Sequence, residues 1–225
     1  MSEQTSKFKQ KALWFFHSFI WLGLLLFVID IVSKSLVVAS RDYILSQSSQ
    51  GIILIPNFLA INYVINTGAA FGLSAGDSEA GYIVNRVVYI VIAVLASAGI
   101  IFFYCKKYSK IRLYYRACMM LILCGAIGNL VDRIFYTPAY LGVEHNGVVD
   151  WINFFGIWGY NFNIADSCLV IGVIMLIVML IVEEVQDSRK KNAQFKKQIA
   201  AEKASKEEAK KPEENLEEKP AEPKE

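Results

Sequence analysis

Residues 162–182 read FNIADSCLVIGVIMLIVMLIV, an apolar run that begins beside an aspartate. A helix needs about 20 residues to cross the hydrocarbon of a bilayer, and this run is long enough. Comparable stretches lie at Ala12–Val32, Ile83–Tyr104 and Leu113–Phe135. Apolar residues make up 55% of the chain, and the charged residues occur in blocks. The sequence therefore predicts an α-helical integral membrane protein with four transmembrane helices.

The basic residues predict how these helices are oriented. They lie before the first predicted span, between the second and third, and after the fourth: Lys7, Lys9, Lys11, Lys106, Lys107, Lys110, Arg112, Arg116, Arg189, Lys190 and Lys191. Cytoplasmic segments retain positive charge during insertion, so both termini are expected in the cytoplasm. The connections 33–82 and 136–161 are then extracytoplasmic. A cleavable signal peptide is the alternative for the first run, but the run exceeds the roughly 7–15 apolar residues of such peptides.

Two parts of the chain differ in character. Residues 1–182 contain the four predicted spans, whereas residues 183–225 are almost wholly polar and are expected to be a disordered cytoplasmic tail. Within the first extracytoplasmic connection, Gly51–Pro56 and Phe58–Asn66 are rich in β-branched and aromatic residues. This composition favours short strands and predicts a small β-rich structure outside the membrane.

Polar residues gather at the outer ends of the predicted spans. Positions three or four apart share one side of a helix, so Asp30 and Lys34 are expected to pair. Charged groups at this depth commonly pair, and the same is expected of Asp132 and Arg133. The polar residues that the topology brings to this level are Asp30, Lys34, Asn66, Asn129, Asp132, Arg133, Asp150, Asn163 and Asp166.

Asp150 and Asp166 have no basic residue within four positions along the chain. Two carboxylates held close share a proton, and such a pair can hydrolyse a peptide bond without a metal. Spacing alone does not favour this pair over Asp132 with Asp166. No metal or cofactor is expected, because a cluster of Glu144, His145 and Asp150 lacks the spacing of a metal motif.

Five blocks of the sequence resemble the bacterial lipoprotein signal peptidases (signal peptidase II), which are aspartic endopeptidases of the plasma membrane. The blocks occur in family order and the resemblance covers Ala12–Val182. They are Asp30-Ile31-Val32-Ser33-Lys34, Asn66-Thr67-Gly68-Ala69-Ala70-Phe71, Gly125-Ala126-Ile127-Gly128-Asn129-Leu130-Val131-Asp132-Arg133, Val148-Val149-Asp150 and Phe162-Asn163-Ile164-Ala165-Asp166-Ser167.

The resemblance implies that Asp150 and Asp166 are the catalytic dyad, and it implies an extracytoplasmic sheet that cradles the substrate. Residues that would bind substrate or support the site are Asp30, Lys34, Asn66, Gly68, Asn129, Asp132, Arg133 and Asn163. The implied substrate is a diacylglyceryl-modified prolipoprotein, cut on the amino-terminal side of its lipidated cysteine. Other implied partners are membrane lipids and peptide-like inhibitors such as globomycin, with no nucleic acid.

Three rival functions would each account for part of the sequence. A small proton-coupled transporter also holds carboxylates in the membrane, but throughout its depth. A serine–lysine peptidase could use Ser33 or Ser35 with Lys34, although neighbours on a helix point in different directions. A non-catalytic scaffold explains the tail and leaves the polar cluster unexplained. Residues 74–81 are expected to act as a lid, and the long segment Tyr136–Gly147 leaves open how Asp150 is presented.

Overall fold

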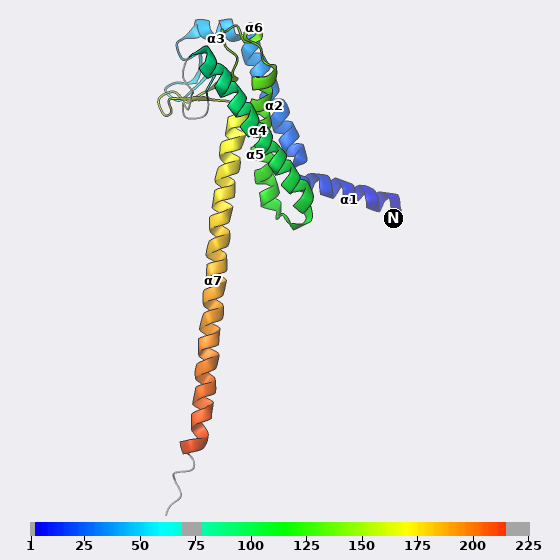
Figure 1. The fold of residues 1–225 in the computed structure, drawn as a ribbon, viewed down its shortest axis with the longest axis vertical. Coiled ribbons are helices and arrows are strands. Elements are labelled where there is room, and N and C mark those ends of the chain that lie inside the picture. The colour runs from blue at the N-terminus through cyan, green and yellow to red at the C-terminus, as the bar shows by residue number, and fades with distance from the viewer. Residues whose placement is uncertain (1–2, 69–77, 215–225) are drawn as a thin grey trace, which may run out of the picture. The chain divides into compact units, whose positions relative to one another are not determined.

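The computed structural model describes residues 3–68 and 78–214. Within these residues, four helices contain segments long and apolar enough to cross a membrane, as predicted: α2 (Ile20–Ala39), α4 (Glu79–Lys107), α5 (Leu113–Phe135) and α7 (Ile164–Glu214) (Figure 1). The chain forms two compact units, Met1–Leu176 and Ile177–Glu225. Helix α7 continues through the polar residues to Glu214. The predicted boundary at residue 182 and the disorder of the tail stay predictions.

The first span lies further along the chain than predicted. Helix α1 (Glu3–Ser18) ends before Phe19, whose φ of 56° places it in the left-handed region, and α2 then begins at Ile20. The Ser18 hydroxyl donates to the carbonyl of Phe15 and accepts from the amide of Ile20, which replaces helical bonds at this point. The span is therefore Ile20–Ala39 and not Ala12–Val32, because the apolar run contains a break that hydropathy does not reveal.

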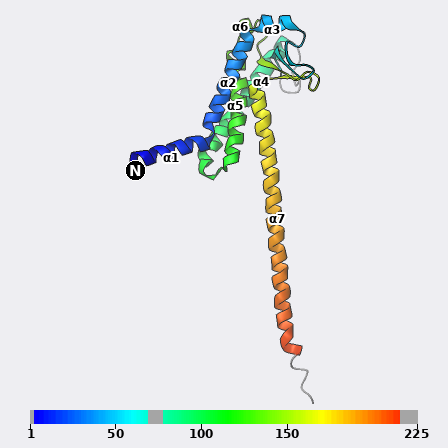
Figure 2. The same cartoon turned by 180° about the vertical axis from the view of Figure 1, so that it is seen from behind.

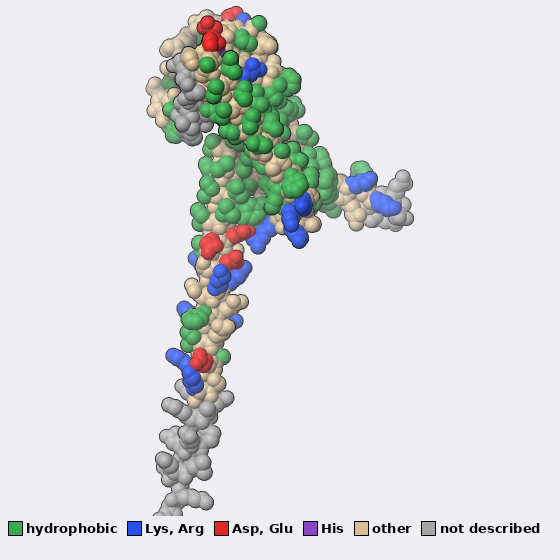
Figure 3. Space-filling model, in the orientation of Figure 1, with side chains coloured by type: hydrophobic (Ala, Val, Ile, Leu, Met, Phe, Trp, Pro, Cys, Tyr) green, Lys and Arg blue, Asp and Glu red, His purple; other side chains and the backbone are tan. Residues whose placement is uncertain are grey.

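Helix α5 lies at the centre of the helices that surround the polar cluster. It contacts both α2 and α4. In its most apolar stretch 44% of the residues are buried, against 11–22% in the corresponding stretches of the other three spans. The exposed apolar side chains on α2, α4 and α7 form the green surface in Figure 3, and Leu95 and Phe102 are 68% and 65% exposed. Such a surface is suited to lipid, as expected of a membrane protein.

Two glycines of α5 permit close approach to the first turns of α7. A Cβ atom on Gly125 would lie 2.3 Å from the carbonyl oxygen of Ala165. One on Gly128 would lie 2.7 Å from Oδ2 of Asp30 and 2.8 Å from the Cβ of Ala165. Small residues let membrane helices pack closely, so this stripe brings α5, α2 and α7 together at the site.

We expect Gly128→Ala to lower the stability of the protein by roughly 1–3 kcal/mol, because the added methyl group forces tightly packed atoms apart. Gly99→Ala in α4 is the matched control, since a Cβ there meets nothing within 4 Å. Thermal unfolding of both variants in the same detergent measures the difference. Equal melting temperatures would show that the contact at Gly128 relaxes without cost.

The sheet has four antiparallel strands in the order β1-β2-β3-β4. Strands β1 (Ile52–Ile55) and β2 (Leu59–Asn66) are the two that composition predicted. Strand β2 also pairs with β3 (Val148–Asn153), so that Val64 lies opposite Asp150 and Asn66 opposite Val148. A two-residue β4 (Asn161–Phe162) completes the sheet. The pairing of β2 with β3 brings the site residues of two distant connections together.

A hydrophobic cluster fixes the sheet to the end of α2. Its buried members come from α2, α3 (Arg41–Gln47), β2, α6 (Pro138–Leu141) and β3: Val37, Val38, Ile44, Tyr63, Leu141 and Val149. Side chains alternate across a strand, so Val149 and Trp151 face this cluster while Asp150 faces the opposite side. Figures 1 and 2 show α3 and α6 beside the same end of α2.

The segment Tyr136–Gly147, whose effect on Asp150 the sequence left open, contributes to this cluster through α6. Thr137 caps α6 by accepting from the amide of Tyr140, and Leu141 is fully buried. The Tyr63 hydroxyl of β2 donates to the carbonyl of Leu141. The long connection is thus attached to the sheet, close to the strand that carries Asp150.

Candidate active site

Asp166 lies in the first turn of α7 and is held by a reciprocal cap. Its amide donates to Oδ1 of Asn163 at 2.8 Å, and its Oδ2 accepts from the amide of Asn163 at 3.2 Å. This is a capping box, in which residues three apart satisfy each other's free amides at the start of a helix. The positive end of the helix dipole also favours a carboxylate there. The cap therefore fixes the side chain of Asp166 in one position.

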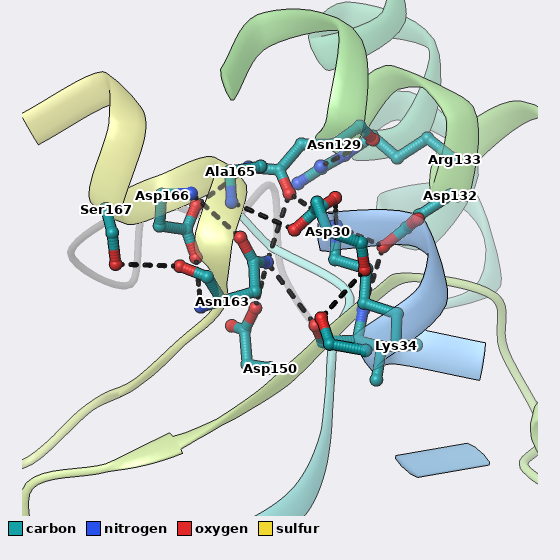
Figure 4. Close-up of polar contacts among 12 residues, drawn as sticks. Asp30, Lys34, Asn129, Asp132, Arg133, Asp150, Asn163, Ala165, Asp166 and Ser167 are labelled. Atoms are coloured by element: carbon teal, nitrogen blue, oxygen red, sulfur yellow. Dashed lines mark hydrogen bonds and ion pairs between the residues drawn. The ribbon is translucent and has the colours of Figure 1, made fainter. Parts of the chain in front are cut away.

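Asp150 is brought to the same residue from the sheet. Its Oδ1 accepts from Nδ2 of Asn163 at 2.8 Å, and its Oδ2 accepts from Nδ2 of Asn66 at 3.0 Å (Figure 4). Asn163 thus bridges the two aspartates, with its side chain on Asp150 and its backbone amide on Asp166. Asp150 is 3% exposed. The family resemblance implies this pair of aspartates, whereas nothing in the sequence predicts the bridge through Asn163.

Asn129 of α5 connects Asp166 with a buried charge cluster. Its Nδ2 donates to Oδ1 of Asp166 at 2.7 Å, and its Oδ1 accepts from Nζ of Lys34 at 3.2 Å. Lys34 also pairs with Asp30 at 2.8 Å and with Asp132 at 2.9 Å, and all three of these side chains are fully buried. One lysine between two carboxylates compensates much of the cost of burying them.

Two backbone amides that sequence reasoning missed complete this cluster. Asp30 Oδ1 accepts from the amide of Ala165 at 2.9 Å, and Asp132 Oδ2 accepts from the amide of Val149 at 3.2 Å. Ala165 and Val149 each precede an aspartate of the site. The buried carboxylates thus hold the backbone next to Asp166 and next to Asp150. No pattern of side chains signals these contacts, because any residue provides a backbone amide.

The predicted pairing of Asp132 with Arg133 is wrong. Asp132 pairs with Lys34, whereas the guanidinium of Arg133 donates to the carbonyl of Gly68 at 2.8 Å and lies 5.1 Å from the ring centre of Tyr89. Consecutive residues on a helix point about 100° apart, so the two side chains leave α5 in different directions. Gly68 contributes the backbone carbonyl that accepts from Arg133, and its backbone amide donates to Oδ1 of Asn66.

The sequence also places Glu144, His145 and the proposed lid near the site. His145 stacks on Tyr82 with 3.8 Å between ring centres, and its Nε2 is 3.7 Å from Glu79. Glu144 and His145 therefore group with Glu79 and not with Asp150. Of the proposed lid, residues 74–77 lie outside the described residues, and so do Ala69–Phe71 of the matching blocks.

Burial, with the negative charge of Asp166 as the second cause, raises the pKa of Asp150 to about 8. Hydrogen bonds from Asn66 and Asn163 and the charge of Lys34 act in the opposite direction but are outweighed. Desolvation and a nearby like charge both disfavour the ionised carboxyl group. Both causes disfavour two ionised carboxylates side by side, which suits a pair of carboxyl groups that divide one proton between them.

Comparisons with known proteins identify the family of this chain. The model of the signal peptidase (SPase) II family matches residues 22–182. A lipoprotein signal peptidase of Fusobacterium nucleatum is 38% identical over 173 residues, which cover 77% of this chain and 89% of that protein. One from Desulfitobacterium hafniense is 33% identical over 166 residues, covering 73% and 94%. The chain belongs to the signal peptidase II family.

A solved bacterial membrane enzyme structure supports the same fold. It superposes with a TM-score of 0.57 at 27% identity, over 73% of this chain and 88% of that one. The protein is thus a membrane aspartic signal peptidase, and signal peptidases II cleave signal peptides from lipid-modified prolipoproteins. Helix α1 and residues 183–225 lie outside the part that the family model matches.

Proposed function

We propose that Asp150 and Asp166 are the catalytic dyad of this signal peptidase II. The observation that supports this most strongly is the bridge through Asn163, which contacts both carboxyl groups. The bridge holds groups from β3 and α7 in a fixed relation. Two carboxyl groups so placed can divide one proton, which metal-free peptide hydrolysis requires.

The chemistry follows from that single proton. The ionised carboxylate takes a proton from water as the water oxygen attacks the scissile carbonyl carbon, and the protonated partner donates to the carbonyl oxygen. The tetrahedral intermediate then collapses. Its C–N bond breaks as the amine takes the proton from one carboxyl group, and a hydroxyl group of the intermediate returns its proton to the other carboxylate, so that the dyad again holds one proton. The raised pKa of Asp150 favours Asp150 as the protonated partner at the start.

The remaining polar residues position the dyad. Asn66 and Asn163 direct Asp150, and Asn129 directs Asp166. The cluster of Asp30, Lys34 and Asp132 holds the backbone beside both aspartates. Arg133 fixes the carbonyl of Gly68, in the segment that leads from β2 to α4. In this proposal each predicted site residue has a structural task within reach of the dyad.

The position of the dyad suits a substrate with a lipid anchor. Asp166 lies in the first turn of a membrane-length helix, and the sheet that carries Asp150 adjoins the same end of the bundle. We place this end at the outer face of a bacterial plasma membrane, with both termini in the cytoplasm, because the basic residues lie at the opposite ends of the spans. The acyl chains of a diacylglyceryl cysteine then stay in lipid while the bond on its amino side reaches the dyad. A peptide-like inhibitor such as globomycin would occupy the same space.

Activity should fall as the pH rises through about 8. Above its raised pKa, Asp150 ionises, and the dyad loses the proton that it divides. The folded state should also lose stability relative to the unfolded state as the pH rises from about 4 to 8, because a carboxyl group with a raised pKa stabilises the fold only while it is protonated. Cleavage of a lipid-modified precursor measured from pH 5 to 10 would show this descending limb. A flat profile through pH 9 would argue against a proton held by Asp150.

The rival functions can be tested on the full-length protein in sealed vesicles that contain a lipid-modified precursor. We expect cleavage by the wild type and equal cleavage by Ser33→Ala. The Ser33 hydroxyl donates to the carbonyl of Asp30, and Lys34 is paired with two carboxylates, so neither is arranged as a nucleophile and its base. Loss of cleavage in Ser33→Ala would support a serine–lysine peptidase, and proton flux without cleavage would support a transporter.

A further inference from the structure

Helix α1 is a basic amphipathic helix that precedes the residues matched by the family model. One stripe carries apolar residues at the i, i+4, i+7, i+8 spacing of a single helical face: Phe8, Ala12, Phe15 and Phe16. The three aromatic residues are 74%, 40% and 59% exposed. Lys9 and Lys11 flank this stripe on its two sides, and Lys7 lies further round the helix. A soluble environment would leave this large apolar face in water.

Basic and aromatic side chains also lie together on one side of α1. Lys7, Gln10, Lys11 and Trp14 line a hollow of about 250 Å³. Tryptophan and lysine are the residues that membrane proteins place at the level of the lipid headgroups.

The second half of α1 is fixed to the turn between α4 and α5. The rings of Trp14 and Tyr108 lie 5.7 Å apart, and the Tyr108 hydroxyl donates to the carbonyl of Trp14. Arg116 donates to the carbonyl of His17 at 3.3 Å. The same turn, which includes the short helix η2 (Tyr108–Lys110), carries exposed Lys106, Lys107 and Lys110. Figure 3 shows the blue side chains of this region at the end of the bundle away from the sheet.

These features exclude two other placements of such a helix, across the bilayer and inside the helix bundle. The alternation of lysines with apolar residues between Lys7 and Leu13 leaves no run long enough to span a bilayer, and α1 is not among the candidate spans. The bundle does not bury the apolar stripe either, since Phe8 and Phe16 are more than half exposed. The break at Phe19 lets α1 leave the direction of α2, as Figures 1 and 2 both show.

We propose that α1 lies in the membrane surface and binds the headgroups of anionic phospholipids. The stripe of Phe8, Ala12, Phe15 and Phe16 enters the acyl region, while Lys7, Lys9 and Lys11 contact phosphate groups. Each lysine near an anionic membrane surface contributes about 1 kcal/mol of attraction, and a helix of this kind binds through buried apolar area together with that charge. The lysines of the α4–α5 turn extend the same basic surface.

Lipid preference provides the first test. The full-length protein, released from detergent in a mass spectrometer, is titrated with phosphatidylglycerol and with phosphatidylcholine. We expect the triple variant Lys7→Gln, Lys9→Gln, Lys11→Gln to lose at least about tenfold in its preference for phosphatidylglycerol. The control Lys196→Gln, Lys197→Gln, Lys203→Gln removes equal charge from the exposed part of α7 and should keep the preference. Equal behaviour of the two variants would overturn the proposal.

The depth of the helix provides the second test and does not depend on peptidase activity. Spin labels are placed at Phe8→Cys and at Gln10→Cys on opposite faces of α1, in full-length protein with the exposed Cys105 changed to serine. In nanodiscs that contain phosphatidylglycerol, the label at 8 should be accessible to oxygen and the label at 10 to a water-soluble nickel reagent. Equal access of water to both would contradict a surface helix. Dipolar coupling between two labels at position 8 would instead assign the apolar stripe to a second copy of the chain.

Discussion

Asp150→Asn and Asp166→Asn should each reduce cleavage of a lipid-modified precursor by about a thousandfold or more. An asparagine has nearly the same shape as an aspartate but can neither take a proton from water nor give one to the leaving amine. Loss of a positioned proton-transfer group alone costs about 10²–10⁴ in rate. In this proposal the two carboxyl groups act as a unit, so the loss of either should be almost as severe as the loss of both.

The control for this experiment is Asp42→Asn in α3, where the aspartate side chain is 94% exposed. It removes the same charge at a distance from the dyad and should leave cleavage unchanged. Melting temperatures of all three variants distinguish lost chemistry from lost folding, since an amide at position 150 faces two amide donors. A folded Asn variant that cleaves at more than about a tenth of the wild-type rate would exclude its aspartate from the dyad.

Local patterns predicted those parts of the molecule that depend on near neighbours in the sequence. The third span occupies Leu113–Phe135 as expected, because its apolar run has clear ends. Strands β1 and β2 lie within the segments that composition indicated, and Asp30 and Lys34 pair at the i, i+4 spacing. Each of these features is decided by residues at most a few positions apart.

Features that depend on distant residues could not be predicted in the same way. Strand β3 is stabilised by pairing with β2, more than 80 residues earlier in the chain, and no local pattern specifies that partner. The partner of Asp132 is Lys34 from another helix, not the adjacent Arg133. The resemblance to signal peptidase II supplied the choice of Asp150 with Asp166. The geometry adds the bridge through Asn163, a contact between β3 and the start of α7 that the sequence does not place in space.

Lys34→Met should lower the free energy of unfolding by roughly 3–5 kcal/mol, because it removes the single cation from a buried cluster of two carboxylates. Lys34 Nζ lies 2.8 Å from Asp30 and 2.9 Å from Asp132, and none of the three side chains is exposed. Methionine fills a similar volume, so the loss is electrostatic and not a cavity. Thermal unfolding in detergent at pH 7 measures this loss. The control is Lys206→Met, because Lys206 forms an ion pair with Glu202 in which both side chains are exposed.

Adding Asp30→Asn and Asp132→Asn to Lys34→Met should restore most of the melting temperature, since a buried ion cluster replaced as a whole is often neutral for stability. Cleavage should not recover. Lys34 also donates to Oδ1 of Asn129, whose Nδ2 holds Asp166, so the repaired variant still lacks the contact that directs the amide of Asn129. A single Lys34→Met variant with the melting temperature of the wild type would mean that the two carboxylates are not both charged in the folded protein. A repaired variant with full activity would show that Lys34 contributes to stability and not to the position of Asp166.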